Sequence, residues 1–412
     1  METNSIKNVV GQHVTGKNFY GRVEDLEKAW RLVNEDLKSL ILADPRRVGK
    51  TSFAYKIKEN AEKEKWICLF CDIRGCFTEK ELYEHLKKEL KKNRYYKNID
   101  DNTNNKIKVT KIKILPDIKV SHVDGIHISG VGAELERQYE NMSHDKNIYD
   151  LLNDLDHSKN TLIVLDELVT FLHNLTGEKK KNLETVKIFL KKLYAAIKKP
   201  DSKIRWILCS SLSIDKFLSD HKLENTMGEM NRFTIDALND KEAEGLIKAL
   251  ANSYNLVFSD ESIKYMLKKL GWNIPYFIQL LFHEILELEE KPVNISIEII
   301  EEAYQEVLAN ANRQRYFLTW IKHIDEYSGN ERKCAHIILE ELSKQEEGSS
   351  KNTLTLLILN TLKGKGDFEK VLENMLEKLE QGGYIIANKK ENKHLFRSPL
   401  LRDFWYNKFV KR

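Results

Sequence analysis

Apolar residues form short runs along the first half of the chain, and amphipathic stretches separate these runs. Each run is nearly free of polar positions and is bounded by turn residues, which is typical of strands in a parallel sheet that is buried on both faces. The pattern predicts four strands, over residues 39–43, 66–73, 161–168 and 204–211. It predicts helices over 23–38, 50–65, 78–90 and 184–199. This alternation favours an α/β fold.

The pattern changes further along the chain. Residues 91–146 hold a polar run followed by alternating apolar and basic positions, which predicts an inserted β-hairpin or meander over about 98–140. Its lysines would form either a solvated face or a contact with a partner. From about residue 236 the pattern is wholly helical. Near the end, helices precede two short strands joined by a polar turn, which indicates a winged helix, with the elements at 333–345, 352–361, 367–383, 384–390 and 393–399.

These changes predict three domains. The first is an α/β core over 1–235 that carries the β-rich insertion at 98–140. The second is a helical domain over 236–325, and the third is a winged-helix domain over 326–412. Thr78 and Glu81 have the spacing of a capping box at the start of one core helix.

Composition narrows the class of protein. The net charge is 67 − 63 = +4, so no global polycation argues for nucleic acid as a partner. The chain does not begin like a signal peptide and has no apolar run that could span a membrane, so we expect a cytoplasmic protein. Cys68 and Cys71 form a CxxC without a second pair, which favours buried strand thiols over a metal or redox site. We expect Phe404, Trp405 and Tyr406 to lie in the core of the last helix.

The residues after the first strand are typical of a phosphate-binding loop. In the pattern G-x-x-x-x-G-K-[ST], the last three places are filled by Gly49, Lys50 and Thr51. The loop lies between a buried strand and the start of a helix, where free N–H groups and the positive helix end can bind a polyphosphate. We therefore expect Lys50 to reach the β- and γ-phosphates of a nucleotide and Thr51 to bind Mg²⁺.

The first place of this pattern holds Asp44 instead of glycine. A glycine there allows a tight backbone turn, and aspartate tolerates positive φ better than most other residues. A carboxylate some 8–10 Å from the phosphates would repel them by only about 0.5 kcal/mol if water screens it. We therefore expect a functional loop, with the hydrolysis rate left open.

A second motif supplies two acids. The strand predicted over 161–168 ends in Asp166 and Glu167, at the sheet edge where open α/β sheets bind ligands. There, Asp166 would hold Mg²⁺ through water, and Glu167 would act as the base that activates the attacking water. A further predicted strand ends in Ser210 and Ser211, so polar groups from three strands would meet at one edge.

Together these motifs resemble those of the archaeal-type ATPases, a branch of the AAA+/STAND superclass of P-loop proteins. That family's loop commonly has G-P-R-R-V-G-K-T-S, which Pro45–Ser52 matches apart from the leading glycine. The other similar stretches are FYGRVEDLEKAW (19–30), CDIRGCFTEKEL (71–82), RWILCSSLSIDKFL (205–218), LGWNIPYFIQLL (270–281) and FRSPLLRDFW (396–405). In the family they form the adenine-side box, the second strand, the sensor-1 strand, the start of a lid helix and the end of the winged helix.

The resemblance implies a P-loop NTPase core with a parallel sheet, a helical lid and a C-terminal winged helix, with ATP and Mg²⁺ as ligands. It implies nucleotide contacts from Tyr20, Gly21, Arg22, Pro45, Arg46, Arg47, Val48, Gly49, Lys50, Thr51, Ser52 and Pro275. It also places Ser211 at the polar sensor position. Arg232 lies where some relatives have an arginine that completes a neighbouring subunit's site, although an ordinary surface arginine fits this position equally well.

Three functions compete at this point. The first is a Mg²⁺-dependent, STAND-like ATPase switch, which the resemblance connects with prokaryotic conflict or antiphage defence and with an effector protein or a homo-oligomer as partner. The second is a DNA-binding ATPase of replication or transposition. Residues 384–412 carry eight Lys and Arg against two Asp and Glu, but residues 326–412 have a net charge of only 16 − 13 = +3. The third is a scaffold that does not hydrolyse nucleotide, against which the Asp166–Glu167 pair argues.

Overall fold

The computed structural model describes most of the chain outside one long internal segment. The described residues are 5–36, 38–92, 148–153, 155, 158–177, 182–211, 213–289, 293–310, 312–327, 329–362 and 368–411. The β-rich insertion predicted over 98–140 lies outside the described residues.

A parallel five-stranded sheet forms the first half of the protein, which confirms the predicted fold class. Its order is β2-β3-β4-β1-β5, and the strands are β1 (Leu40–Leu42), β2 (Ile67–Asp72), β3 (Thr161–Asp166), β4 (Ile204–Cys209) and β5 (Asn231–Arg232). The four strands predicted from the apolar runs are all present, and β5 is an additional short edge strand. Because β4 lies between β1 and β3, the residues that follow β4 lie between the phosphate loop and the two acids.

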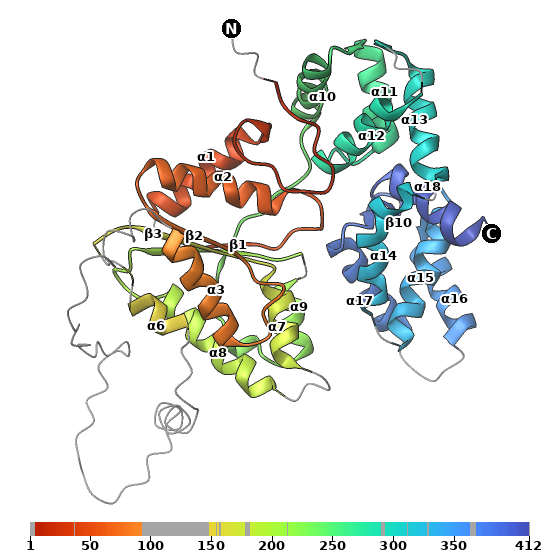
Figure 1. Cartoon of the computed structure of the whole chain (residues 1–412). Coiled ribbons are helices and arrows are strands. Elements are labelled where there is room, and N and C mark those ends of the chain that lie inside the picture. Colours follow the sequence, from red (N-terminus) through yellow and green to blue (C-terminus); the bar gives the residue numbers. More distant parts are fainter. Residues whose placement is uncertain are drawn as a thin grey trace, which may run out of the picture.

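Helices cover both faces of this sheet (Figure 1). On one face lie α1 (Val23–Asn34) and α2 (Lys50–Lys63), and on the other lie α3 (Glu79–Lys92), α6 (Ile148–Asn153), α7 (Leu168–Thr176), α8 (Leu183–Ile197) and α9 (Ile214–Asp220). The CxxC cysteines fall into the two opposite cores, Cys68 on the α1–α2 face and Cys71 on the other. Both are free and buried, as predicted for strand thiols, and Cys76, Cys209 and Cys334 are free and buried as well.

The second half of the protein consists mainly of helices, and its described residues also form two small β-sheets. Its first helices are α10 (Asp240–Tyr254), α11 (Asp260–Leu270), α12 (Pro275–Glu287) and α13 (Ile297–Ala309). The expectation of a wholly helical segment is wrong at one point, because β6 (Val257–Phe258) and β7 (Asn294–Ile295) pair in parallel. These strands are two residues long, which is too short to produce an alternating pattern in the sequence.

The C-terminal part contains the predicted helices and strands, together with a further strand. Its elements are η4 (Arg313–Phe317), α14 (Leu318–Asp325), α15 (Gly329–Ser343), β8 (Ser349–Ser350), α16 (Lys351–Leu362), α17 (Phe368–Gln381), β9 (Ile385–Asn388), β10 (Lys393–Phe396) and α18 (Pro399–Trp405). The strand order is β8-β10-β9. Phe404 and Trp405 are buried as predicted, but Tyr406 is exposed, whereas Phe409 one turn later packs against the same core.

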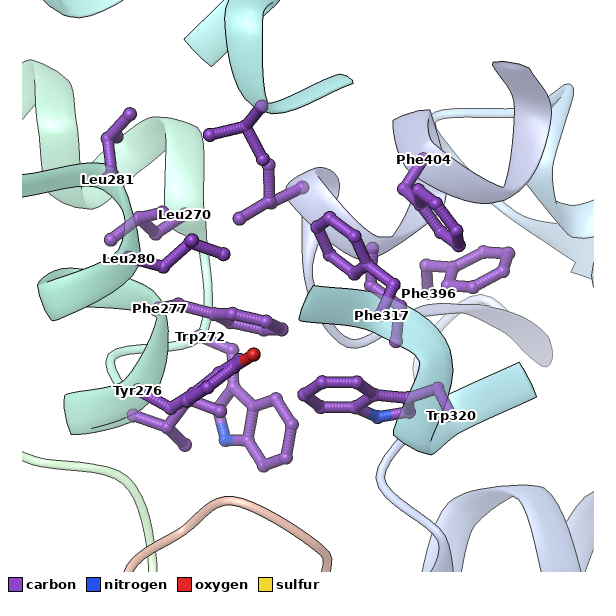
Figure 2. Close-up of a cluster of buried hydrophobic side chains, with 14 of the residues drawn as sticks. Leu270, Trp272, Tyr276, Phe277, Leu280, Leu281, Phe317, Trp320, Phe396 and Phe404 are labelled. Carbon is purple, nitrogen blue, oxygen red and sulfur yellow. The ribbon is translucent and has the colours of Figure 1, made fainter. Parts of the chain in front are cut away.

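One hydrophobic core joins α10–α13 to the C-terminal part (Figure 2). Phe277 of α12 stacks on Trp320 of α14 with 5.4 Å between ring centroids, and Phe317 stacks on Phe404 of α18 at 4.1 Å. The boundary predicted between residues 325 and 326 therefore lies inside a continuous core. The division of this half into a lid and a winged-helix domain stays a prediction.

Residues 5–22, which we call the N-terminal strap, connect the two halves. The strap's backbone N–H groups donate to side chains of the helical half at Ile6 (Ser253 Oγ, 2.9 Å) and at Val9 (Gln279 Oε1, 2.7 Å). Further along, Val14 N donates to Ser52 Oγ of α2 at 3.0 Å. The strap thereby links α2 to α12. In the part of the chain that the structure describes, no helix has the length and apolar character that a membrane span requires.

Candidate nucleotide-binding site

A cavity of about 500 Å³ lies at the carboxyl edge of the sheet, between α2, the N-terminal strap and the helical half. The predicted site residues that line it are Tyr20, Arg22, Arg46, Arg47, Val48, Gly49, Lys50, Thr51, Ser52, Asp166, Glu167, Ser211 and Pro275. Segments far apart in the sequence therefore meet in one place. Three predicted residues, Gly21, Pro45 and Arg232, do not line the cavity.

The loop before α2 has the backbone that a phosphate site requires. Gly49 is the N-cap of α2 and has φ of 108°, a value that side chains rarely allow. The first turn of this 14-residue helix begins at Lys50, so its free N–H groups face the cavity. Lys50 is only 6% exposed, and its Nζ donates to the carbonyl oxygens of Asp44 (2.6 Å) and Pro45 (2.8 Å). Burial lowers the pKa of Lys50, and the nearby carboxylates of Glu167 and Asp44 oppose that shift.

Two hydrogen bonds join the remaining predicted groups at the sheet edge. Thr51 Oγ1 donates to Asp166 Oδ2 at 2.8 Å, and Ser211 Oγ donates to Glu167 Oε1 at 2.7 Å. Burial raises the pKa of Asp166 to about 6, while the bond from Thr51 opposes that rise. Glu167 has φ of 64°, and strained backbone of this kind is concentrated at functional sites.

These groups fit a magnesium nucleotide. The Thr51 hydroxyl and the Asp166 carboxylate are hard oxygen ligands within hydrogen-bonding distance of one another, as Mg²⁺ prefers. The helix end and Lys50 supply the positive charge that a polyphosphate needs. The described residues contain no group of three or more His, Cys, Asp and Glu side chains that could hold a metal ion.

Asp44 differs from the expectation in both conformation and environment. It is not among the residues with positive φ, and the loop's left-handed positions are Arg47 (φ 69°) and Gly49. The carboxylate is 7% exposed, and its Oδ2 accepts a hydrogen bond from the backbone N–H of Ile235 at 3.0 Å. Burial raises the pKa of Asp44, and the bond from Ile235 partly offsets this. The side chain therefore does not substitute for a flexible glycine, because it connects the loop to the segment that follows β5.

This contact predicts a stability difference between two substitutions. Asp44→Ala leaves the buried N–H of Ile235 without a partner, which costs about 1–3 kcal/mol. The midpoint of thermal unfolding without nucleotide should fall by roughly 1–4 °C. Asp44→Asn keeps an oxygen acceptor in the same place and should unfold close to the wild-type temperature. Equal midpoints for Asp44→Ala and the wild type would show that the hydrogen bond from Ile235 to Asp44 does not stabilise the fold.

The two loop arginines contact the helical half of the protein. Arg47 donates from Nη2 to Thr319 Oγ1 of α14 at 2.9 Å, and its guanidinium lies over the Tyr276 ring, 4.7 Å from the centroid. Arg46 Nη2 lies 3.8 Å from Glu326 Oε2. Both arginines also line the cavity, so each lies between the expected phosphates and the C-terminal part.

The predicted adenine-side residues lie near the part of the loop that directly precedes α2. Arg22 is 4% exposed and donates from Nη2 to the Val48 carbonyl at 2.9 Å, and its backbone N–H donates to Glu242 Oε1 of α10 at 2.5 Å. Tyr20 lines the cavity and Pro275 begins α12 at its wall. Their contact with a base stays a prediction. Arg232 lies on edge strand β5, where it is exposed and paired with Asp215.

Sequence reasoning missed several residues of the cavity wall. They are Val9, Gly11, Gln12, His13, Val14, Asn18 and Phe19 of the strap, Tyr55, Phe70, Asp72 and Arg74 beside β2, and Leu246, Tyr276, Gln279 and Thr319 of the helical half. Asp72 and Arg74 belong to the stretch 71–82 that resembles the family's second strand, although no role was predicted for either residue. The strap has no periodic pattern, so nothing in its sequence alone indicates the site.

The whole fold is similar to two proteins of known structure. A Walker-type ATPase of Pyrococcus abyssi has a TM-score of 0.61 at 14% sequence identity, over 97% of this chain and 99% of that chain. The ORC2 protein of Aeropyrum pernix, in ADPNP–ADP complexes, has a TM-score of 0.52 at 13% identity, over 98% and 96% of the two chains. No protein-family model matches the sequence, and no curated protein matches it significantly. The chain therefore shares its overall α/β fold with this Walker-type ATPase and with ORC2, in agreement with the fold class predicted from the sequence.

Proposed function

We propose that this protein binds ATP with Mg²⁺ and hydrolyses it to ADP and phosphate. The observation that carries the proposal is the convergence of the Lys50–Thr51 loop, the Asp166–Glu167 pair and Ser211 on one cavity, with hydrogen bonds from Thr51 to Asp166 and from Ser211 to Glu167. The similar folds of a Walker-type ATPase and of ORC2 in ADPNP–ADP complexes support a nucleotide as the ligand.

Each residue has a role that its position allows. Lys50 and the start of α2 bind the phosphates, and Thr51 and Asp166 hold the metal, which would neutralise phosphate charge. Glu167 accepts the proton of the attacking water as the new P–O bond forms and the bond to the β-phosphate breaks. Ser211 orients Glu167 through the 2.7 Å hydrogen bond.

We further propose that the protein works as a switch. The loop that binds phosphate is the same loop that binds the C-terminal part, through Arg46–Glu326 and Arg47–Thr319. Since α10–α18 share one core, a movement of the loop on nucleotide binding would shift the whole helical half together. A role in antiphage defence, with an effector protein or further copies of the chain as partners, rests on the sequence resemblance alone.

DNA binding through the C-terminal part is the second candidate. In its favour, Lys389 and Lys390 are exposed at the turn between β9 and β10. Against it, the exposed residues of α17 include Glu369, Glu373 and Glu377, spaced so that they share one face of the helix. Phosphates of DNA would be repelled from that face.

Phosphate release from ATP by the purified chain tests these proposals. With Mg²⁺ we expect turnover that needs no DNA and that stops when the metal is chelated. If duplex DNA raised the rate severalfold, the DNA-binding ATPase would become the better proposal. If ATP bound without turnover under all conditions, the non-hydrolysing scaffold would replace both.

A further inference from the structure

Arg74 lines the cavity, although neither the loop motif nor the acid motif includes it. It follows β2, whose last residue Asp72 is paired in register with Asp166 of β3. Arg74 lines the cavity together with Asp166, Glu167 and Ser211. The hydrogen bonds with Asp72 raise the pKa of Arg74, and the carboxylates of Glu167 and Asp166 add to that rise, so the guanidinium stays charged.

The backbone of Arg74 is held firmly, while its side chain is accessible. Asn174 of α7 donates from Nδ2 to the Arg74 carbonyl at 2.8 Å and to the Cys76 carbonyl at 3.1 Å. Because α7 begins directly after Glu167, the turn that carries Arg74 is fixed relative to the proposed base. The Arg74 side chain is 61% exposed, which leaves the guanidinium free to exchange partners.

A phosphate could replace Asp72 as the partner of the Arg74 guanidinium. Asp72 accepts from Arg74 Nε at 3.0 Å and from Nη2 at 2.5 Å, so the two side chains form a bidentate pair only two residues apart. A phosphate offers the same bidentate geometry with more charge. The other arginines of the cavity are already bound to more distant parts of the protein: Arg22 to the Val48 carbonyl, Arg46 to Glu326, and Arg47 to the Gly11 carbonyl and Thr319.

We propose that Arg74 is a catalytic residue that binds the terminal phosphate of ATP in its own subunit. Without ATP, the Asp72 carboxylate binds the guanidinium, and the phosphate replaces it when ATP binds. This inference rests on the proposed ATPase function. As water attacks and the bond to the β-phosphate breaks, negative charge on the transferred phosphoryl oxygens is stabilised by the guanidinium. The chain would then need no arginine from a neighbour, such as Arg232, to complete its site.

Binding measurements test the contact with the terminal phosphate. Arg74→Ala should weaken binding of a non-hydrolysable ATP analogue about tenfold or more and leave ADP binding within about twofold, because ADP lacks that phosphate. Turnover should fall about 100-fold or more. Arg74→Lys should recover part of both. Asp72→Asn is the matched control, because it removes the same ion pair but leaves the arginine, so it should keep the preference for ATP.

A mixing experiment tests whether Arg74 acts in its own subunit. Arg74→Ala has an intact loop without the arginine, and Lys50→Ala has the arginine without a working loop. If Arg74 serves its own site, a mixture should hydrolyse ATP no faster than the two variants do separately. A mixture that regains activity would place Arg74 in a neighbour's site and overturn the inference.

These measurements distinguish a failure of the proposed role of Arg74 from a failure of the proposed ATPase function. If the wild-type chain bound no ATP, the proposed function would fail and this inference with it. If the wild type bound ATP and Arg74→Ala bound both nucleotides as the wild type does, only the inference would fail. Equal loss of ATP preference in Arg74→Ala and Asp72→Asn would show that the pair is structural, which also overturns it.

Discussion

Replacing Lys50 with alanine is expected to abolish the thermal stabilisation that ATP confers on the wild-type chain. A ligand that binds only the folded state stabilises it by about 2.7 kcal/mol at a concentration 100 times its Kd. Lys50 is buried in the loop, where its ammonium bonds the carbonyls of Asp44 and Pro45. No other side chain of the loop can place a compact positive charge at this point, so its loss should remove tight binding.

The measurement is the shift of the unfolding midpoint with ATP and Mg²⁺, compared within each variant. Lys58→Ala is the matched control, because Lys58 lies on the same helix α2 and pairs with Glu62 at the surface. It should show the full wild-type shift. An undiminished shift in Lys50→Ala would mean that this loop is not the nucleotide site.

Replacing Glu167 with glutamine is expected to stop turnover while ATP stays bound. Glutamine has the same shape, and its Oε1 can still accept the hydrogen bond from Ser211, but it cannot take a proton from water. A general base contributes about 10²–10⁴-fold to a rate, so phosphate release should fall by that factor. ATP should then remain on the protein unhydrolysed.

Phosphate release and the identity of the retained nucleotide should be measured together. Glu184→Gln, at an exposed position of α8, makes the same chemical change away from the cavity and should behave as the wild type. Turnover at the wild-type rate in Glu167→Gln would require a different base. Loss of ATP binding in that variant would instead assign Glu167 to nucleotide or metal binding.

The parts of the site that follow each other in the sequence were predictable. The phosphate loop was recognisable because strand, turn and helix are consecutive, so Gly49, Lys50 and Thr51 have a known backbone context. Asp166 and Glu167 were recognisable for the same reason, since they end a buried strand. In the parallel sheet, the loop that follows β1 and the acids that end β3 lie at the same edge.

Other parts depend on partners that are distant in the sequence. The partner of the Asp44 carboxylate is 191 residues away, and the strap residue Val9 bonds a side chain 270 residues away. The pattern around Asp44 indicated a turn that tolerates aspartate, whereas its role as an acceptor for Ile235 became visible only in the folded chain. The same holds for Arg74, whose neighbours Asp166 and Glu167 come from a different strand.

The sequence by itself therefore determined the strands, the helices and the chemical groups that end them, because propensities, capping and turn signals act over a few residues. The tertiary structure decided which of those groups share a cavity and which are engaged elsewhere. In the folded chain Arg46 contacts Glu326 and Arg47 contacts Thr319, whereas Arg74 lines the cavity and pairs with Asp72, two residues away. Charge pairing and burial depend on how distant segments meet, and no local pattern records this.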